Sequence, residues 1–338
     1  MAQKHNLKSI AKIAGVSKST VSRVINKQRY VKPQIRGKIL AIIKRENYYP
    51  NGLARGLVSN RTNTIGIVVF GLDPLFLSNQ LYYEIIQGIQ KKALEFDIDL
   101  ILYSPDKMAN DFCYKIIGRR NVDGLIIMGE LIHIDYLRLF YKAQLPMVLI
   151  GKRHTQDLQI PYVCTDYNSG AYQATKYLID LGRRDIVMMQ CFRDLLHEKE
   201  KLEGYKKALK EKGVAFRPEF VLEGQALQAN AKGIIREALK KHAHIDGIFA
   251  ANDLMAQGCI QEVQSFGLSI PGNISVIGFD DIITAKSFNP PLTTVRQDKL
   301  RLGGEALDIL VECLSSRTAK PRVLPAELVV RETTCPIA

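Results

Sequence analysis

Five side chains between residues 18 and 26 have the chemistry and the spacing of a surface that contacts DNA bases. Placed on a helix at about 100° per residue, they share one side, which carries Lys18, Ser19, Ser22, Arg23 and Asn26. The opposite side is apolar, with Val21, Val24 and Ile25. Hydroxyl, amide and guanidinium groups can hydrogen-bond to base edges in the major groove of DNA. This stretch therefore predicts a helix that packs on one side and presents hydrogen-bonding groups on the other.

Three short helices are predicted around these residues. In the first, apolar residues recur at steps of three and four: Leu7, Ile10, Ala11 and Ala14. Asn6 can cap this helix, and Ser17, after a turn at 15–16, can cap the second helix, at about 18–26. The third helix is expected to begin at Pro33 and to end near 46–47, with one apolar stripe formed by Ile35, Ile39, Ile42 and Ile43. Such a bundle has the geometry of a helix-turn-helix that enters the major groove.

The positive charge of the chain is concentrated in the same segment. The 338 residues carry a net charge of +13, and residues 1–60 hold thirteen basic side chains against a single acidic one, Glu46. The rest of the chain holds 34 basic and 33 acidic side chains and is nearly neutral. Such segregation indicates a small module that neutralises phosphates, joined to a larger neutral module with another task.

Two segments resemble a known protein family. Residues 10–26, IAKIAGVSKSTVSRVIN, resemble the signature of the lactose-repressor (LacI/GalR) family of bacterial transcriptional regulators. Residues 47–57, NYYPNGLARGL, resemble the hinge helix of that family, and the resemblance continues along essentially the whole remaining chain.

The resemblance implies roles for single residues. Lys18, Ser19 and Arg23 match positions that contact bases in the major groove. The other DNA contacts that we expect are Ser22, Asn26, Arg29, Ala54 and Arg55. Leu57 matches a leucine that inserts into the minor groove at the operator centre and kinks the DNA, so the hinge around it is expected to fold on DNA.

From residue 62 onward, short apolar runs alternate with amphipathic stretches, which predicts strand–helix units and parallel sheets. The expected strands are 65–70, 98–103, 124–128, 147–150, 185–189, 247–250 and 275–278. A segment of about 275 residues exceeds one comfortable sheet, which favours two Rossmann-like subdomains that face a cleft. The predicted fold class is therefore α/β. It combines a small all-α helix-turn-helix head with a core of two parallel-sheet subdomains, and the resemblance implies a periplasmic-binding-protein-like core.

The expected domain organisation has three parts: a DNA-binding head (1–49), a hinge helix and linker (50–61), and a core that binds an effector and dimerises (62–338). The resemblance implies that the chain crosses between the subdomains near Cys164, Thr294 and Arg322. Subdomain 1 would then comprise about 62–163 and 295–322, and subdomain 2 about 164–294 and 323–335.

Polar residues that follow predicted strands are the candidates for ligand binding, because parallel strands present their carboxyl ends at one edge of a sheet. Asn252 and Asp253 follow one strand, and Asp280 follows another. The resemblance matches them to positions that hydrogen-bond a sugar-like effector, and it adds Tyr82, Lys201 and Gln297 to the predicted site. Helix capping is an alternative role for Asn252 and Asp253. Asp166 could lie at the rim of the site or cap the helix that follows it.

Two departures from the family pattern concern the charge of the effector. Lys201 stands where the family usually has an effector-clamping arginine, and Gly151 stands where it often has an aspartate. At position 201 a lysine ammonium, which acts as a point charge, thus replaces a planar guanidinium group, and at position 151 a carboxylate is missing. Because Lys152 and Arg153 follow Gly151, an anionic effector, either a sugar acid or a sugar phosphate, is a hypothesis beside a neutral sugar.

Other classes of protein are disfavoured by the sequence. No glycine-rich phosphate loop follows the strand at 65–70, so no nucleotide cofactor is indicated, and we find no nucleophile elbow, zinc-binding helix motif or catalytic grouping of histidines. The six cysteines are spaced singly, which predicts reduced thiols and no metal site. No apolar run reaches membrane-spanning length and no secretion signal is seen, so a cytoplasmic, nucleoid-associated protein is expected.

These features favour a sequence-specific repressor of carbohydrate-utilisation genes. It would bind a palindromic operator as a homodimer and respond to a small effector in the core. A second hypothesis keeps the head but takes its signal from a protein corepressor, as catabolite regulators of the family do. A distant third is a sugar-binding or enzymatic core with no regulatory role. Whether the effector releases or promotes DNA binding stays open.

Overall fold

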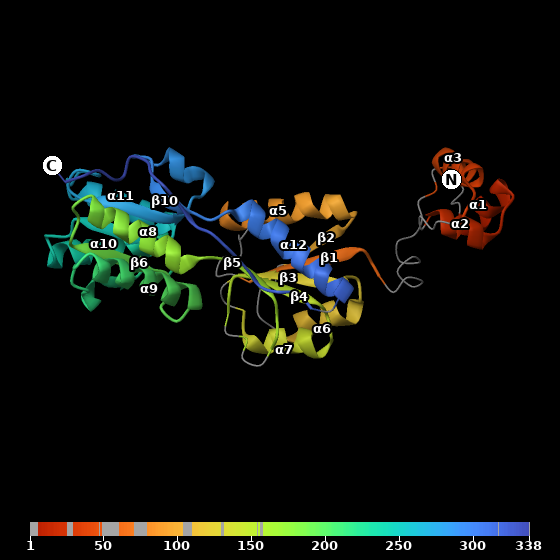
Figure 1. The fold of residues 1–338 in the computed structure, drawn as a ribbon, viewed down its shortest axis with the longest axis horizontal. Coiled ribbons are helices and arrows are strands. Elements are labelled where there is room, and N and C mark those ends of the chain that lie inside the picture. Colours follow the sequence, from red (N-terminus) through yellow and green to blue (C-terminus); the bar gives the residue numbers. More distant parts are fainter. Residues whose placement is uncertain are drawn as a thin grey trace. The chain divides into compact units, whose positions relative to one another are not determined.

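The computed structural model describes residues 6–25, 30–46, 48, 61–70, 80–103, 110–129, 132–153, 155, 158–316 and 318–337. The chain divides into two compact units, Met1–Asn63 and Thr64–Ala338. The first unit contains the head and the second is the core, and Figure 1 labels their helices and strands.

The head is a bundle of three helices: α1 (Leu7–Ala14), α2 (Lys18–Ile25) and α3 (Pro33–Arg45). Asn6 caps α1, because its Oδ1 accepts a hydrogen bond from the Ser9 amide at 2.9 Å. Gly15 ends α1 with a φ of 67°, which glycine adopts without strain. The Thr20 amide donates to Ser17 Oγ at the start of α2. The buried centre of the bundle includes Ile10, Ala14, Val21, Val24 and Ile39. The three predicted helices and both caps are confirmed.

The first subdomain of the core is built on sheet 1, in which six parallel strands have the order β11-β5-β4-β3-β1-β2. These strands are β1 (Thr64–Val69), β2 (Asp99–Tyr103), β3 (Gly124–Met128), β4 (Met147–Ile150), β5 (Tyr162–Thr165) and β11 (Arg322–Leu324). One face is covered by α5 (Gln80–Phe96) and α12 (Lys299–Ser316), and the other by α6 (Asn110–Arg119) and α7 (Ile134–Lys142) (Figure 1). Because both faces are covered, β3 and β4 are buried along their whole length.

The second subdomain is built on sheet 2, with the order β12-β10-β9-β8-β6-β7. Its strands are β6 (Ile186–Gln190), β7 (Val221–Glu223), β8 (Gly247–Ala250), β9 (Ser275–Asp280), β10 (Thr293–Arg296) and β12 (Glu327–Val329). All pairs are parallel except β10 with β12. The helices on one face are α8 (Tyr167–Asp180) and α9 (Leu196–Glu211), and those on the other are α10 (Gln228–Lys241) and α11 (Asp253–Ser265). Within the described part of this subdomain, short 3-10 helices lie before β7, at η2 (Pro218–Phe220), and after β9, at η3 (Ile283–Ser287).

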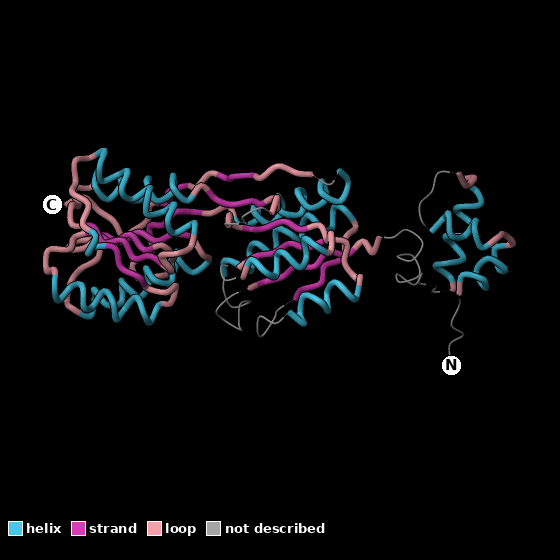
Figure 2. Tube along the Cα trace, turned by 90° about the horizontal axis from the view of Figure 1, so that it is seen from below, coloured by secondary structure: helices cyan, strands magenta, loops and turns pink. Residues whose placement is uncertain are grey.

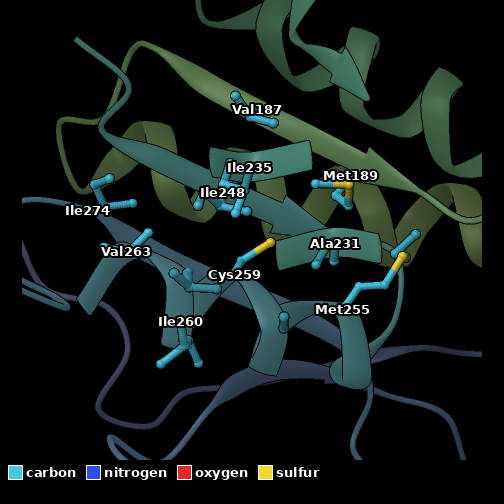
Figure 3. Close-up of a cluster of buried hydrophobic side chains, with 14 of the residues drawn as sticks. Val187, Met189, Ala231, Ile235, Ile248, Met255, Cys259, Ile260, Val263 and Ile274 are labelled. Carbon is cyan, nitrogen blue, oxygen red and sulfur yellow. The ribbon is translucent and has the colours of Figure 1, made fainter. Parts of the chain in front are cut away.

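A buried apolar layer joins sheet 2 to α10 and α11. Figure 3 shows Ile235 of α10 and Cys259 of α11 beside Ile248 of β8, and all three are 0% exposed. Burial of one such aliphatic side chain contributes about 1.5–3 kcal/mol to stability. Burial also raises the pKa of the Cys259 thiol to about 12. All six cysteines are free thiols and five of them are buried, as their single spacing predicted.

The chain passes between the two sheets three times, at residue 166, at 297–298 and at 325–326 (Figure 2). Each crossing lies two to four residues beyond the position expected from the sequence. The reason is that the residues at these boundaries still pair within their strands. Cys164 pairs with Val323 in sheet 1, and Val295 pairs with Phe279 in sheet 2.

Most predicted strands agree closely with the structure. The predictions at 124–128, 147–150 and 247–250 are exact, and the other four differ by one or two residues. The strands that the apolar runs did not indicate, β5, β7, β10, β11 and β12, have only three or four residues each. Among the described residues, no helix is long and apolar enough to span a membrane.

Candidate DNA-binding surface and effector site

The outward side of α2 carries the predicted base-contacting residues. Lys18, Ser19 and Arg23 are exposed and Ser22 is half-buried, whereas Val21 on the opposite side is 0% exposed. The structure thus orients α2 as the helical projection predicted, with its hydrogen-bonding groups toward solvent. The remaining predicted DNA contacts lie outside the described residues: Asn26, Arg29, Ala54, Arg55 and Leu57.

The charge of the head is not balanced from within. Its single acidic side chain, Glu46, accepts from Arg45 Nε at 2.8 Å. Exposed lysines on all three helices, among them Lys12, Lys18 and Lys38, add to the positive surface. A surface of this kind attracts the phosphates of DNA over a distance of about 10 Å at moderate salt.

In the core, polar side chains gather at the carboxyl ends of neighbouring strands in sheet 2. Gln190 ends β6, Asn252 follows β8, Asp280 ends β9 and Gln297 follows β10. These strands are adjacent and parallel, so the four residues lie at one edge of the sheet. In open α/β sheets this edge is where ligands bind.

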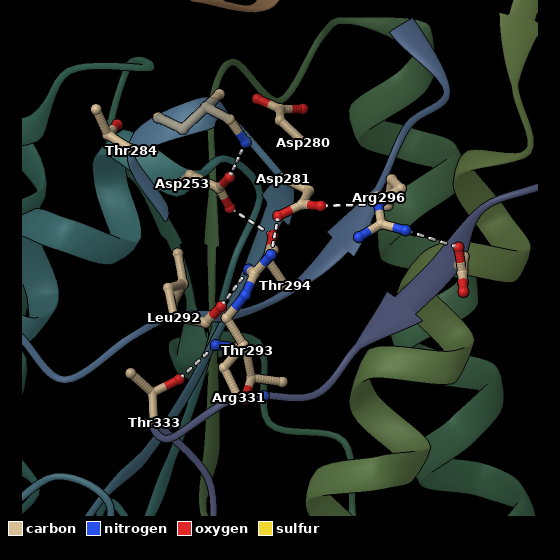
Figure 4. Close-up of polar contacts among 12 residues, drawn as sticks. Asp253, Asp280, Asp281, Thr284, Leu292, Thr293, Thr294, Arg296, Arg331 and Thr333 are labelled. Atoms are coloured by element: carbon tan, nitrogen blue, oxygen red, sulfur yellow. Dashed lines mark hydrogen bonds and ion pairs between the residues drawn. The ribbon is translucent and has the colours of Figure 1, made fainter. Parts of the chain in front are cut away.

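Asp280 has an unusual backbone conformation. Its φ is 116° and that of Asp281 is 52°, both in the region that favours glycine. Strain of this kind costs about 1–3 kcal/mol per residue and is concentrated at functional sites. Asp280 Oδ1 accepts from Gln297 Nε2 at 2.6 Å, and Gln297 Oε1 accepts from Thr165 Oγ1 at 2.7 Å. In Figure 4 the Asp280 side chain points away from the ion pairs of Asp281.

A buried lysine holds the backbone of this turn. Lys299 is the first residue of α12 and is 4% exposed. Its ammonium donates to the carbonyl oxygens of Asp280 and Asp281, at 2.7 and 2.6 Å, and lies 3.3 Å from Glu84 Oε1 on α5. Lys299 of subdomain 1 therefore contacts the strained turn of subdomain 2, and Glu84 lies beside its ammonium.

The side chain of Asp281 is held by two arginines (Figure 4). Arg296 Nε donates to it at 2.8 Å and Arg331 Nη2 at 2.6 Å, while Arg331 Nη1 also donates to the Leu292 carbonyl at 2.7 Å. Burial alone would raise the pKa of Asp281, but the two guanidinium groups outweigh this effect, so its pKa lies below the usual range. This network ties the end of β9 to β10 and to the last segment of the chain.

Asp253 lies behind the edge of the sheet rather than on it. It is 0% exposed, and its two oxygens accept from the Ile282 amide at 2.8 Å and from Thr294 Oγ1 at 2.5 Å. Burial, and then the charge of Asp280, raises the pKa of Asp253 well above its usual range. Both oxygens thus serve the protein itself, so Asp253 supports the edge from within.

Two residues act as the helix caps that the sequence allowed. Asn252 Oδ1 accepts from the Met255 amide at 2.7 Å at the start of α11. Asp166 Oδ1 accepts from the Ser169 amide at 2.9 Å at the start of α8. Asn252 is half-buried at the sheet edge, so its amide also borders the candidate site.

Lys201 is enclosed in subdomain 2 and is 3% exposed. Its ammonium donates to Glu198 Oε1 and to the Ala251 carbonyl, both at 2.8 Å, and lies 4.5 Å from the centre of the Phe279 ring. Burial alone would lower the pKa of Lys201, but the charge of Glu198 outweighs it and raises the pKa above the usual range. Glu198 Oε2 accepts from the Cys191 amide at 2.8 Å.

The facing groups of subdomain 1 come from α5 and from the loop after β4. Tyr82 on α5 is half-buried and packs against the core of sheet 1. On the same helix, Gln80 Oε1 accepts from the Thr284 amide at 3.0 Å. Lys152, after β4, donates to Glu200 Oε1 of α9 at 2.7 Å. These two elements add to the polar contact that Lys299 of α12 makes between the subdomains.

Sequence reasoning missed three residues of this site, Glu198, Asp281 and Lys299. Glu198 and Lys201 have opposite charges three residues apart on one helix, a spacing that could have indicated their pairing. Asp281 adjoins Asp280 in sequence, but its arginine partners are distant. Lys299 gave no signal, because most of its partners are backbone carbonyls and any residue can supply those.

A basic three-helix head joined to a two-sheet core with polar strand ends defines a DNA-binding transcription regulator with a ligand-binding core. Residues 6–51 match the family model "Bacterial regulatory proteins, lacI family", and residues 175–334 match "Periplasmic binding protein-like domain". The chain is 33% identical to the HTH-type transcriptional repressor PurR of Vibrio vulnificus, over 97% of this chain and 98% of that protein. It is 31% identical to catabolite control protein A of Priestia megaterium, over 96% and 98%. The protein belongs to the LacI family.

Solved structures agree with this assignment. The lac repressor dimer bound to operator and the anti-inducer ONPF has a TM-score of 0.84 at 25% identity, over 98% of this chain and 100% of that one. The complex of the transcriptional regulator CelR with cellobiose has a TM-score of 0.75 at 28% identity, over 97% and 99%. The protein is therefore a DNA-binding transcriptional repressor of this family, and its relatives are regulators rather than enzymes.

Proposed function

We propose that this repressor controls carbohydrate-utilisation genes, binds a palindromic operator as a homodimer in the cytoplasm, and responds to a small sugar-like effector in the core. The observation that carries the proposed effector site is the carboxylate of Asp280. It lies on a strained backbone at the carboxyl edge of sheet 2, where ligands of α/β folds bind. The match to a regulator solved with cellobiose supports a carbohydrate.

At the operator, α2 enters the major groove. Lys18, Ser19 and Arg23 contact base edges, and Ser22, Asn26 and Arg29 make further contacts with the DNA. Leu57, flanked by Ala54 and Arg55, inserts into the minor groove at the centre of the operator. Unstacking a base step costs about a few kcal/mol, which contacts on the bent DNA must offset.

In the core, the effector contacts Asp280 and Asn252 on subdomain 2 and Tyr82 on subdomain 1. A carboxylate accepts from hydroxyls, and the Asn252 amide, whose Oδ1 already caps α11, can donate from its Nδ2, which suits a sugar. Gln297 orients the carboxylate and borders the site. Asp253 and Lys201 support these groups from within, since their polar atoms already have partners.

The signal is a shift between two arrangements of the core. An effector that binds one arrangement better than the other changes how the two hinges of the dimer are placed, and so changes the affinity for the operator. The usual range of allosteric coupling corresponds to a roughly 5- to 150-fold change in affinity.

The test is operator binding with and without neutral sugars, sugar acids and sugar phosphates. We expect one class of compound to change the affinity for the operator roughly 5- to 150-fold. The sign of this change distinguishes induction from corepression. Operator affinity that no member of the panel alters would contradict control by a small carbohydrate. Asp280→Ala should abolish the response while the head continues to bind DNA.

A protein corepressor is a second candidate, because the chain is 31% identical to catabolite control protein A over nearly its whole length. Under this alternative the operator affinity changes only when a phosphocarrier protein is added. A pull-down with purified phosphocarrier proteins, followed by the same operator measurement, separates the two candidates.

A further inference from the structure

We infer that the effector site takes an uncharged molecule that donates hydrogen bonds, and that Glu198 excludes anions from it by holding the charge of Lys201 inside the protein. The inference rests on the proposed function and narrows it, because it selects a neutral sugar over the sugar acid or sugar phosphate that the sequence left open. It is carried by the hydrogen bonds of two buried lysines and by the position of one carboxylate.

The first observation is that the donors of Lys201 are fully committed. An ammonium has three N–H donors. Two of them meet Glu198 Oε1 and the Ala251 carbonyl, both at 2.8 Å, and the third side of the ammonium faces the Phe279 ring. With 3% of its surface exposed, Lys201 has no donor left for a ligand. A cation that stands at a clamping position in the sequence is therefore used for internal structure.

The second observation is that Glu198 is equally committed. It is 0% exposed, its Oε1 accepts from Lys201 and its Oε2 accepts from the Cys191 amide at 2.8 Å. The two opposite charges cancel at a distance of 2.8 Å. To bind Lys201, an anion would have to displace a carboxylate that has no solvent to move into, and an unpaired buried charge is strongly unfavourable.

The other lysines near the strand ends also contact acidic groups. Lys299, which is buried, uses its donors on two carbonyls and on Glu84, and Lys152, whose side chain is 40% exposed, pairs with Glu200 at 2.7 Å. The group presented at the edge of the sheet is instead a carboxylate, that of Asp280, which Gln297 orients from one side. A sugar hydroxyl can donate to this carboxylate, whereas a phosphate or a second carboxylate would be repelled by it.

The experiment uses inorganic phosphate as the anionic probe on full-length protein without DNA. Four proteins are compared: the wild type, Lys201→Met, Glu198→Gln and the double variant. The readout is the shift of the unfolding midpoint between phosphate and chloride at equal ionic strength. Because all four proteins share the same basic head, the phosphate bound there contributes equally to each, and differences between them report on the core.

We expect wild type and Lys201→Met to show the same phosphate shift. Glu198→Gln should gain at least about tenfold in phosphate affinity, the equivalent of one new charge interaction, and the gain should disappear in the double variant. The inference would be overturned if the wild type showed a phosphate-induced shift of the unfolding midpoint that Lys201→Met removes. It would also be overturned if Glu198→Gln gained no affinity for phosphate.

A second measurement uses the wild type alone, so it does not depend on whether a variant folds. In the wild type, acylation of lysine amines followed by mass spectrometry compares Lys201 with Lys210, which is exposed on the same helix. We expect Lys201 to react far more slowly than Lys210, at a rate that phosphate does not change. Equal rates, or protection of Lys201 by phosphate, would overturn the inference. Neither measurement involves the operator, so its failure is distinct from failure of the proposed function.

Discussion

The ammonium of Lys299 lies 2.7 Å from the carbonyl oxygen of Asp280, so that the first residue of a helix in subdomain 1 holds the strained turn that presents a carboxylate in subdomain 2. A backbone with a φ of 116° at a non-glycine residue persists only when its surroundings fix it. Lys299 supplies that fixation from the opposite subdomain. The position of the Asp280 carboxylate and the arrangement of the two subdomains are thereby linked through one side chain.

Replacement of Lys299 by methionine should therefore affect both stability and signalling. The variant leaves two half-buried carbonyls and Glu84 without their cation, so we expect the free energy of unfolding to fall by about 3 kcal/mol. The operator response to effector should weaken as well, and Lys299→Arg should restore part of it. Denaturant unfolding and operator binding measure the two effects. Leu300→Ala, at an exposed neighbour, is the control and should change stability by no more than about 0.5 kcal/mol.

Asp253 should give the core a pH dependence of its own. Its pKa is raised in the folded state, so the folded protein holds a proton that the unfolded chain has released. Stability should then fall as the pH rises from the usual carboxyl pKa toward the raised value. Asp253→Asn should remove this slope, because a neutral amide cannot titrate. Unfolding free energies of both proteins across this pH range test the point, and identical slopes would contradict it.

Two glycines in helices of subdomain 1 should respond in opposite ways to alanine. A methyl group at Gly88 of α5 would overlap the backbone carbonyl of Leu300, where α5 crosses α12 closely. We expect Gly88→Ala to cost about 1–3 kcal/mol through overpacking. Gly118 of α6 has open space around the same position, and there alanine should stabilise by up to about 1 kcal/mol through helix propensity. Thermal unfolding of the two variants gives the comparison.

The surface of α2 should determine which bases are preferred. Lys18→Ala should relax the preference at one position of each half-site and cost about 1–3 kcal/mol there. Lys38→Ala, on the exposed side of α3, should weaken binding to all sequences alike and reduce the salt dependence by about one unit. Binding to a set of single-base operator variants at several salt concentrations distinguishes the two. A uniform loss for Lys18→Ala would show that it contacts only phosphates.

Leu57 should contribute to operator binding mainly by bending the DNA. Leu57→Ala should weaken operator binding and reduce the bend, because no side chain then holds the central base step open. Binding and bending assays on one operator fragment check both effects. Equal affinity of wild type and variant would mean that Leu57 does not insert.

How much the sequence could predict depends on the distance between partners along the chain. The head was predictable because its caps join residues three apart, as Ser9 and Asn6 do. The longer strands were predictable from their apolar runs. The position of Asp280 and Asn252 at the ends of such strands was also predictable. The contacts that organise it were not, because Thr165 and Gln297 are separated by 132 residues and Lys299 and Asp280 by 19. No local pattern encodes such pairs.

The hydrogen bond between Thr165 and Gln297 has a mechanical consequence. Thr165 ends the strand before the first crossing, and Gln297 begins the second crossing. Their hydrogen bond therefore joins two of the three connections between the subdomains to each other. Bodies joined at one point can rotate about three axes, whereas bodies joined along a line can only bend about it. The core is therefore expected to have one soft degree of freedom. Any ligand that moves it, whatever its chemistry, would drive the same bending motion and would differ from other ligands only in direction and extent.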